Sequence, residues 1–154
     1  MTQCKDKDGN LVCIHETLED VKRRYNTVKD LSQTKTHEII DFLGLTHWYT
    51  SPSDNIQASV MMWNPNKSFK PHKHLTYDRV GTLTQEVMIC ISGKMRYSIW
   101  ADDKQHLVTS ALNPGDILIV FRGYHDYEIL DENTIVYEVK NGPFNGVSND
   151  KEYL

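Results

Sequence analysis

The chain has 154 residues, of which 39% are hydrophobic and 25% are charged, and this size and composition suit one soluble domain with a sizeable core. The formal net charge of −4 and the pI near 5.9 provide no basic surface, so we expect no nucleic-acid partner and no membrane partner. The apolar runs are far shorter than the roughly 20 residues of a membrane helix, and the first ten residues lack the apolar segment of a secretory signal, so we expect a cytoplasmic protein.

The N-terminal third shows helical periodicity. Between residues 16 and 31 apolar side chains recur three or four positions apart, which predicts one face of a helix; they are Leu18, Val21, Tyr25, Val28 and Leu31. A second helix of about two turns is expected over residues 36–44, from a Thr36 cap to Gly44. We therefore interpret residues 1–50 as an N-terminal helical extension.

From about residue 56 the sequence consists of short segments rich in Val, Ile, Tyr, Trp and Thr, separated by turn residues. Eight strands are expected, over residues 56–63, 70–75, 85–91, 95–101, 106–112, 117–121, 125–130 and 134–140. Short strands with no helix between them are typical of an all-β sandwich or a small barrel of the jelly-roll kind. Residues 51–154 are expected to form this barrel, within a single domain overall.

Two histidines and a glutamate stand out in the segment "FKPHKHLTYDRVGTLTQEVMICISG". In a strand, residues two apart point to the same side, so His72 and His74 are expected to project together. Glu86 begins an apolar strand and shares a face with Met88 and Cys90, which indicates that its carboxylate enters the interior. Imidazole nitrogens and a carboxylate converging on one point can hold a divalent transition metal with positions left open for substrate.

A third histidine, His125, follows the apolar strand and glycine turn of "PGDILIVFRGYH". With this segment, the pattern "HKH", Glu86 and Gly93 resembles the two motifs of the cupin superfamily. The resemblance covers residues 69–139 and implies a cupin-type double-stranded β-helix. It also implies that His72, His74, Glu86 and His125 bind one divalent transition metal, Fe, Zn, Ni or Mn, inside the barrel. Eleven residues separate His74 from Glu86, more than is usual in cupins, and this predicts an enlarged loop at the barrel mouth.

Several side chains are candidates for surrounding the metal. Arg79 in the enlarged loop can present a cation to an anionic substrate group. Arg96 and Tyr97 must face opposite sides of one strand, so one of them points inward, where Tyr97 would serve as a proton donor. Tyr127 shares the face of His125 and is expected to pack beside the site. Arg79, Arg96 and Tyr127 are the candidates for binding the substrate.

The strand "TIVYEVK" leaves two orientations open. The simple one places Ile135, Tyr137 and Val139 inside and the charged residues in solvent. In the other, Glu138 and Lys140 line the cavity as an acid/base pair close to the metal.

The C-terminal half is similar to small single-domain cupins of unassigned function that are associated with surface-polysaccharide and nucleotide-sugar pathways. This similarity implies a small-molecule substrate, a sugar or nucleotide sugar, with isomerase or epimerase chemistry, and a homodimer. An iron-dependent dioxygenase or lyase at the same residues is an alternative, and a non-catalytic sugar- or metabolite-binding module is a second. The remaining histidines lack ligand spacing and are interpreted as surface or capping residues: His15, His37, His47 and His106. Cys90 is expected in the core.

Overall fold

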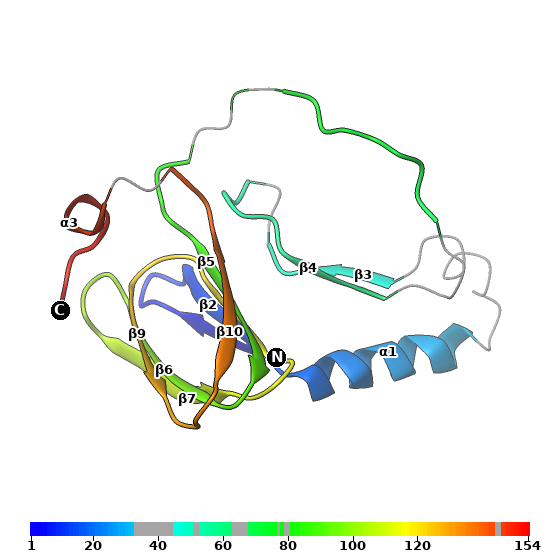
Figure 1. The fold of residues 1–154 in the computed structure, drawn as a ribbon, viewed down its shortest axis with the longest axis horizontal. Helices are drawn as coiled ribbons and strands as arrows, with labels where there is room; N and C mark the ends of the chain where they lie inside the picture. Colours follow the sequence, from blue (N-terminus) through cyan, green and yellow to red (C-terminus); the bar gives the residue numbers. More distant parts are fainter. Residues whose placement is uncertain (33–44, 51–52, 63–67, 77, 79–80, 144–145) are drawn as a thin grey trace.

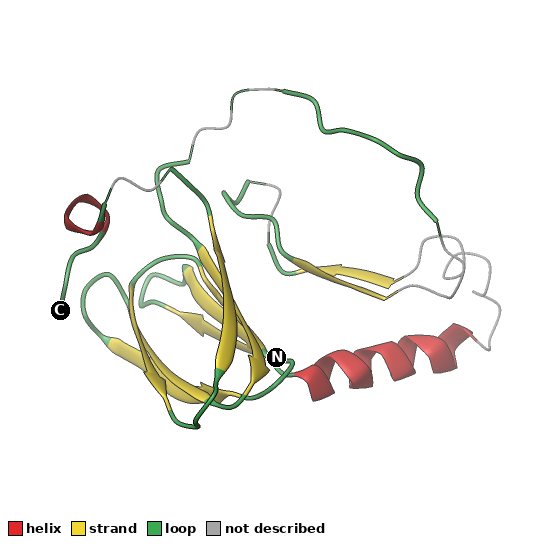
Figure 2. Ribbon diagram, viewed as in Figure 1, coloured by secondary structure: helices red, strands yellow, loops and turns green. Residues whose placement is uncertain are grey.

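The architecture was examined in a computed structural model, which describes residues 1–32, 45–50, 53–62, 68–76, 78, 81–143 and 146–154. Most of the described elements are β-strands, as expected for an all-β fold (Figures 1 and 2). The predicted helix over residues 36–44 lies outside the described residues. No helix within the described ranges has the length and apolar character needed to cross a membrane.

The described residues form ten strands and two helices. They are β1 (Thr2–Lys5), β2 (Leu11–Glu16), α1 (Leu18–Ser32), β3 (Leu45–Trp48), β4 (Ser59–Met62), β5 (Glu86–Ser92), β6 (Met95–Trp100), β7 (His106–Leu112), β8 (Ile117–Val120), β9 (Tyr124–Ile129), β10 (Ile135–Lys140) and α3 (Val147–Asp150).

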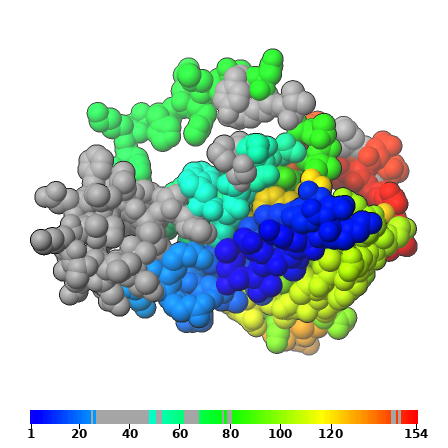
Figure 3. All heavy atoms as spheres, turned by 180° about the vertical axis from the view of Figure 1, so that it is seen from behind, coloured from blue at the N-terminus to red at the C-terminus, as the bar shows by residue number. Residues whose placement is uncertain are grey.

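The strands form two main antiparallel sheets and a hairpin. One sheet has the order β1-β2-β8-β5-β10, and the other has the order β7-β6-β9. A core of buried side chains from both sheets, including Met88, Leu118, Met95 and Ile99, shows that they pack face to face. Strand β1 of the first sheet also lies beside β7 of the second, at the surface seen in Figure 3. The inner faces of the two sheets therefore enclose one apolar core.

The β3–β4 hairpin covers the opposite face of the larger sheet. Tyr49 and Ala58 at its ends pack with Ile14, Val87 and Ile119 in a second buried cluster. The larger sheet is thus buried on both faces in its central part, which explains why its central strands are nearly continuous apolar runs.

Residues 2–16, expected within a helical extension, instead form β1 and β2. Strand β2 pairs with β8 near the centre of the larger sheet. Its sequence "LVCIHE" is buried almost throughout and has no polar alternation, so hydrophobic periodicity gave no strand signal. The helix predicted over residues 16–31 is confirmed as α1, and Thr17 caps it, because its Oγ1 accepts the Asp20 N–H at 3.1 Å.

Most predicted strands of the C-terminal part are confirmed within one or two residues. The strand predicted over residues 56–63 begins three residues later, as β4, and the segment 70–75, which contains His72 and His74, is not a strand. This segment lies in an exposed loop that runs outside the two sheets (Figure 1).

Candidate functional site

Glu86 begins β5 and its carboxylate is buried on the inner side of the larger sheet. The register of the sheet places Glu86 opposite Val120 on one side and Lys140 on the other. Directly opposed residues in antiparallel strands share a face, so Glu86, Val120 and Lys140 all point inward. The sequence-based expectation that Glu86 enters the interior with Met88 and Cys90 is confirmed.

His125 meets Glu86 across the space between the two sheets. Its Nε2 lies 3.2 Å from Glu86 Oε2, with the His125 side chain 25% exposed and that of Glu86 9% exposed. Tyr127, two residues further along β9, stacks at a tilt on the His125 ring with centroids 5.3 Å apart. Its hydroxyl donates to Glu86 Oε2 over 3.5 Å. The expectation that Tyr127 packs beside His125 is therefore confirmed.

Glu138 and Lys140 also lie on the inner side. Glu138 is opposite Met88, and Lys140 is opposite Glu86, so both share the face of the core residues of β5. Lys140 Nζ lies 3.8 Å from Glu138 Oε1 and 3.8 Å from Asp150 Oδ2 of α3. The structure thus selects the second of the two orientations that the sequence left open. We refer to Glu86, His125, Tyr127, Glu138 and Lys140 as the Glu86 site.

Burial and neighbouring charges determine the protonation of Glu86 and Tyr127 in the Glu86 site. The hydrogen bond with His125 lowers the pKa of Glu86; burial opposes this shift, and the charges of His125, Lys140 and Lys151 add to it. Burial raises the pKa of Tyr127, and the negative charges of Glu86 and Glu138 raise it further. The site therefore holds an ionised carboxylate beside a phenol that remains protonated at neutral pH.

A polar network fixes the end of the sheet at which the Glu86 site lies. Gln85, directly before Glu86, donates its backbone N–H to the Asn141 side chain at 2.7 Å, and its own Oε1 accepts the Ile56 N–H at 2.8 Å. Asn141 and Asn55 both donate to the Leu83 carbonyl oxygen. These residues carry no recognisable motif, so their role could not be predicted from the sequence.

His72 and His74 are not brought to the Glu86 site. Both are exposed in the loop of residues 68–76, where His72 Nδ1 lies 3.0 Å from the Lys70 carbonyl oxygen. Their rings remain in edge-to-face contact with centroids 5.5 Å apart, as expected for side chains that project together. Within the described parts of the chain, no three His, Cys, Asp or Glu side chains group closely enough to hold a metal ion.

Two residues expected to bind substrate have different outcomes. Arg96 is opposite Glu128 in the β6–β9 pairing and forms an ion pair with it, with both side chains about half exposed. Because Tyr97 and Tyr127 point into the core, Arg96 must face outward, so the placement of Arg96 beside the site was wrong. Arg79 lies outside the described residues.

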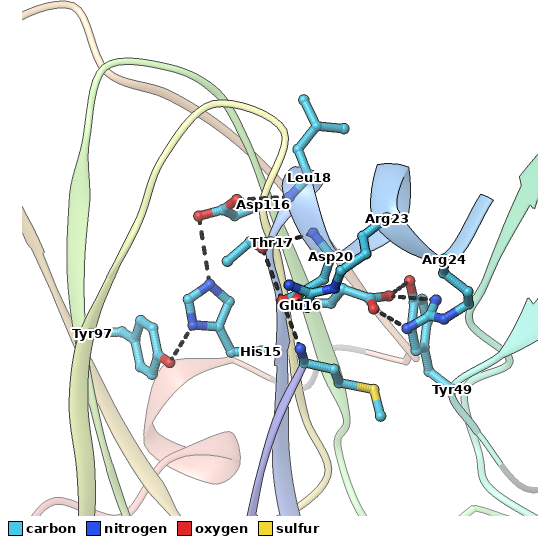
Figure 4. Close-up of polar contacts among 11 residues, drawn as sticks. His15, Glu16, Thr17, Leu18, Asp20, Arg23, Arg24, Tyr49, Tyr97 and Asp116 are labelled. Carbon is cyan, nitrogen blue, oxygen red and sulfur yellow. Dashed lines mark hydrogen bonds and ion pairs between the residues drawn. The ribbon is translucent and has the colours of Figure 1, made fainter. Parts of the chain in front are cut away.

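Tyr97 points inward but belongs to a separate buried cluster (Figure 4). Its hydroxyl is 2.9 Å from His15 Nδ1, and His15 Nε2 is 3.5 Å from Asp116 Oδ2. Asp116 also accepts the Leu18 N–H at 3.0 Å at the start of α1. The interpretation of His15 as a surface residue was therefore wrong, because β2 carries it into the core. We call His15, Tyr97 and Asp116 the His15 cluster.

On the other face of β2, Glu16 forms a second buried polar group with α1 and the hairpin (Figure 4). Its carboxylate accepts hydrogen bonds from Arg24 and from the Tyr49 hydroxyl. This ion pair joins three elements, and its position on the outer face separates it from the Glu86 site. We interpret it as structural.

No protein-family model, curated protein or solved structure matches this chain significantly. The interpretation of the Glu86 site therefore depends on its geometry and chemistry.

Proposed function

We propose that the protein is an enzyme that binds a small polar metabolite at the Glu86 site and moves a proton on it, in the manner of a sugar isomerase or epimerase. The observation that supports this most directly is the contact of the Glu86 carboxylate with His125 at the rim of an otherwise apolar core. A mostly buried carboxylate is costly unless it is paired, and paired titratable groups at such positions are frequently functional. We further propose that the two sheets are those of a cupin-type jelly roll.

Four groups in the site have distinct parts in proton transfer. His125 exchanges the proton with the substrate, because an imidazole can both accept and donate near neutral pH. Glu86 orients the ring through Nε2 and stabilises the imidazolium that forms. Lys140 and the Tyr127 hydroxyl stabilise negative charge that develops on a substrate oxygen.

The positive charge of Lys140 and Lys151 also bears on the kind of substrate. Both charges lower the pKa of the Glu86 carboxyl, and Lys140 is the last residue of β10, directly opposite Glu86. A phosphate-bearing sugar or a nucleotide sugar would place its anionic group against these ammonium groups, with the sugar ring over His125 and Tyr127. Aromatic and imidazole rings offer suitable apolar surfaces for a sugar face.

A metal-dependent form of the site is a second candidate. Two ligands of one transition metal, each at about 2.1 Å and at a right angle, lie about 3.0 Å apart, close to the 3.2 Å between His125 Nε2 and Glu86 Oε2. His72 and His74 would complete the expected set only if their loop folded over this end of the sheets. The described arrangement holds two of the four donors, so the proton transfer above uses the protein's own groups alone.

The experiment that tests the proposed function follows hydrogen exchange at carbon. The protein is incubated in heavy water with a panel of nucleoside-diphosphate sugars and sugar phosphates, and NMR detects deuterium incorporated into the sugar. Glu86→Gln and His125→Gln are expected to reduce exchange at least about 100-fold. The matched control is Glu128→Gln, which changes an outward-facing glutamate of β9 and should leave exchange intact.

Exchange that survives both Glu86→Gln and His125→Gln would contradict the proposal, and so would a panel that binds without exchange, which would favour a binding module. Elemental analysis of protein made without a histidine tag, beside the double variant Glu86→Ala, His125→Ala, tests the metal-dependent form. About one metal per chain in the parent and little in the variant would support it; iron with oxygen-dependent turnover would favour the dioxygenase alternative.

A further inference from the structure

Two cysteines face each other at the edge of the larger sheet. Cys4 of β1 and Cys13 of β2 are directly opposed in the antiparallel pairing. Cys13 is fully buried and Cys4 is half-buried, and both belong to the core between the sheets. Directly opposed residues of antiparallel strands share a face, so the two thiols are directed toward the same part of the core. Cys4 belongs to β1, the dark-blue strand at the surface in Figure 3.

The geometry of this pair suits a disulfide. Directly opposed residues in antiparallel strands have Cα atoms about 4.5–5.5 Å apart, and disulfides join Cα atoms about 4.4–6.8 Å apart. Cys4 and Cys13 are paired within the regular part of the ladder, and the register shifts only after Cys4, between Cys4 and Lys5. Cys90 differs, because it lies in β5 and its thiol is directed at the carbonyl oxygens of Ser92 and Gly93 at the following turn.

We propose that Cys4 and Cys13 form a reversible redox site, in which a peroxide oxidises the two thiols to a disulfide that ties β1 to β2. Cys4 is the attacking residue because it is the more exposed, and Cys13 is the resolving residue because it is buried beside it. This division of roles is that of an accessible sensor cysteine next to a resolving one.

The reaction balances in two steps. The Cys4 thiolate attacks one oxygen of hydrogen peroxide, which gives a sulfenic acid and, after protonation, one water. The Cys13 sulfur then attacks the sulfenic sulfur, its proton leaves with the departing hydroxide as a second water, and the Cys4–Cys13 sulfur bond forms. Two thiols are oxidised, and the peroxide is reduced to two waters.

The electrostatics of the pair favour Cys4 as the first reactant. The hydrogen bond from Cys13 lowers the pKa of Cys4 to about 7, with burial opposing the shift. The pKa of Cys13 is raised by its hydrogen bond with Cys4 and by burial. Burial also raises the pKa of Cys90. At neutral pH, Cys4 thus carries the largest thiolate fraction of the three cysteines and is the best nucleophile.

Peptide mapping of the full chain tests this proposal. The native protein is treated with hydrogen peroxide, its remaining thiols are blocked with N-ethylmaleimide, and it is digested with trypsin without reduction. Cleavage after Lys5 and Lys7 separates Cys4, in residues 1–5, from Cys13, in residues 8–22, whereas Cys90 lies in residues 80–94. A disulfide is therefore the only link that joins the first two peptides.

The expected product is the linked pair of peptides, 2 Da lighter than their sum and separated by dithiothreitol. It should form in the parent and in Cys90→Ser and be absent from Cys4→Ser, in which Cys13 stays a thiol. Before oxidation, iodoacetamide should modify Cys4 at least about 10-fold faster than Cys90 at pH 7, with the rate rising through pH 7. Oxidation should raise the melting temperature of Cys90→Ser by about 5–10 °C.

Three results would overturn the proposal: a disulfide that involves Cys90 or a second chain, sulfinic or sulfonic acid on Cys4 with Cys13 still a thiol, or no reaction of Cys4. If Cys4→Ser fails to fold, the linked peptide and the alkylation rates in Cys90→Ser still decide the matter. None of these readouts depends on the Glu86 site, so they remain informative whether or not the proposed function holds.

Discussion

Lys140 lies directly opposite Glu86 across the antiparallel pairing of β10 with β5. This register decides the orientation of the whole strand, because side chains of opposed residues share a face and neighbours along a strand alternate. Glu138 and Lys140 consequently face the core side, and Ile135, Tyr137 and Val139 face outward. The charged side chains are at the candidate site, and the apolar ones are on the exterior.

The pairing of Glu86 with His125 predicts how stability varies with pH. The lowered pKa of Glu86 means that its contribution to stability is present above the ordinary value of about 4.3 and is lost as pH falls through the lower folded value. In Glu86→Gln the free energy of unfolding should fall by about 1.5–3 kcal/mol at pH 7, and this difference from the parent should shrink as the pH is lowered below about 4. Urea unfolding over a series of acidic pH values measures this.

His125→Leu serves as the control for the direction in which the stability contribution of Glu86 changes with pH. It removes the largest cause of the lowered pKa of Glu86, and burial, the largest of the remaining causes, then raises that pKa against the charges of Lys140 and Lys151. The contribution of Glu86 should then be lost as pH rises through the raised value. Parallel pH profiles for the parent and Glu86→Gln would show that the contact with His125 does not stabilise the fold.

Part of this site could be predicted from the sequence, for identifiable reasons. Turn residues mark the ends of β5 and β9, so Glu86 and His125 were located correctly at the starts of strands. The spacing of residues along the sequence does not determine where an exposed loop lies relative to a sheet. The position of His72 and His74 outside the Glu86 site could therefore not be predicted.

Two other features could not be predicted because their strands lack the usual alternation of apolar inward and polar outward residues. His15 was missed because β2 is covered on both faces and lacks the alternation that identifies a strand. The orientation of β10 could not be chosen because its outward face is the apolar one, the reverse of the usual pattern.

Tyr97 and Tyr127 are directly opposed in the β6–β9 pairing, but removing their hydroxyls should lower the free energy of unfolding by different amounts. Tyr97→Phe leaves the buried His15 Nδ1 without the hydroxyl that lies 2.9 Å away and should cost about 1–3 kcal/mol. The hydroxyl contact of Tyr127 with Glu86 is 3.5 Å long, so Tyr127→Phe should cost less than about 1 kcal/mol. Urea unfolding of both variants compares them, and equal losses would mean that the hydroxyl contact of Tyr97 with His15 stabilises the fold no more than the longer contact of Tyr127 with Glu86.

Two glycines have nearly the same backbone conformation, so alanine substitutions at them distinguish the cost of backbone strain from the cost of steric overlap. Gly9 and Gly123 have φ of 84° and 86°. A Cβ at Gly9 has no atom within 4 Å, whereas one at Gly123 would overlap the Trp100 carbonyl oxygen. Gly9→Ala should therefore cost only the left-handed strain of about 1–2 kcal/mol, and Gly123→Ala a total of about 3–5 kcal/mol.

Gly123 is also two residues from His125, so its backbone shift should reach the Glu86 site. Ligand-induced thermal shifts with the nucleotide-sugar panel should be lost in Gly123→Ala and retained in Gly9→Ala. Comparable stability and ligand response in the two variants would contradict the predicted overlap with Trp100.

We expect the homodimer to form through the outward face of β10. This strand is the last in the sheet order among the described strands, and a strand in that position offers unpaired backbone groups to another chain. Its side chains Ile135, Tyr137 and Val139 are 50%, 61% and 53% exposed, and Ile91 on the neighbouring strand is 44% exposed. An apolar stripe along a sheet edge is typical of a surface that another protein covers.

Antiparallel pairing of two β10 strands about Val139 would also set Glu138 of each chain opposite Lys140 of the other. Sedimentation velocity should therefore show a dimer for the parent and a monomer for Tyr137→Lys combined with Val139→Lys. The control is Leu75→Lys, an even more exposed apolar residue in the loop away from the sheets, which should remain dimeric. A monomeric parent, or a dimer that survives the double substitution, would place any self-association elsewhere.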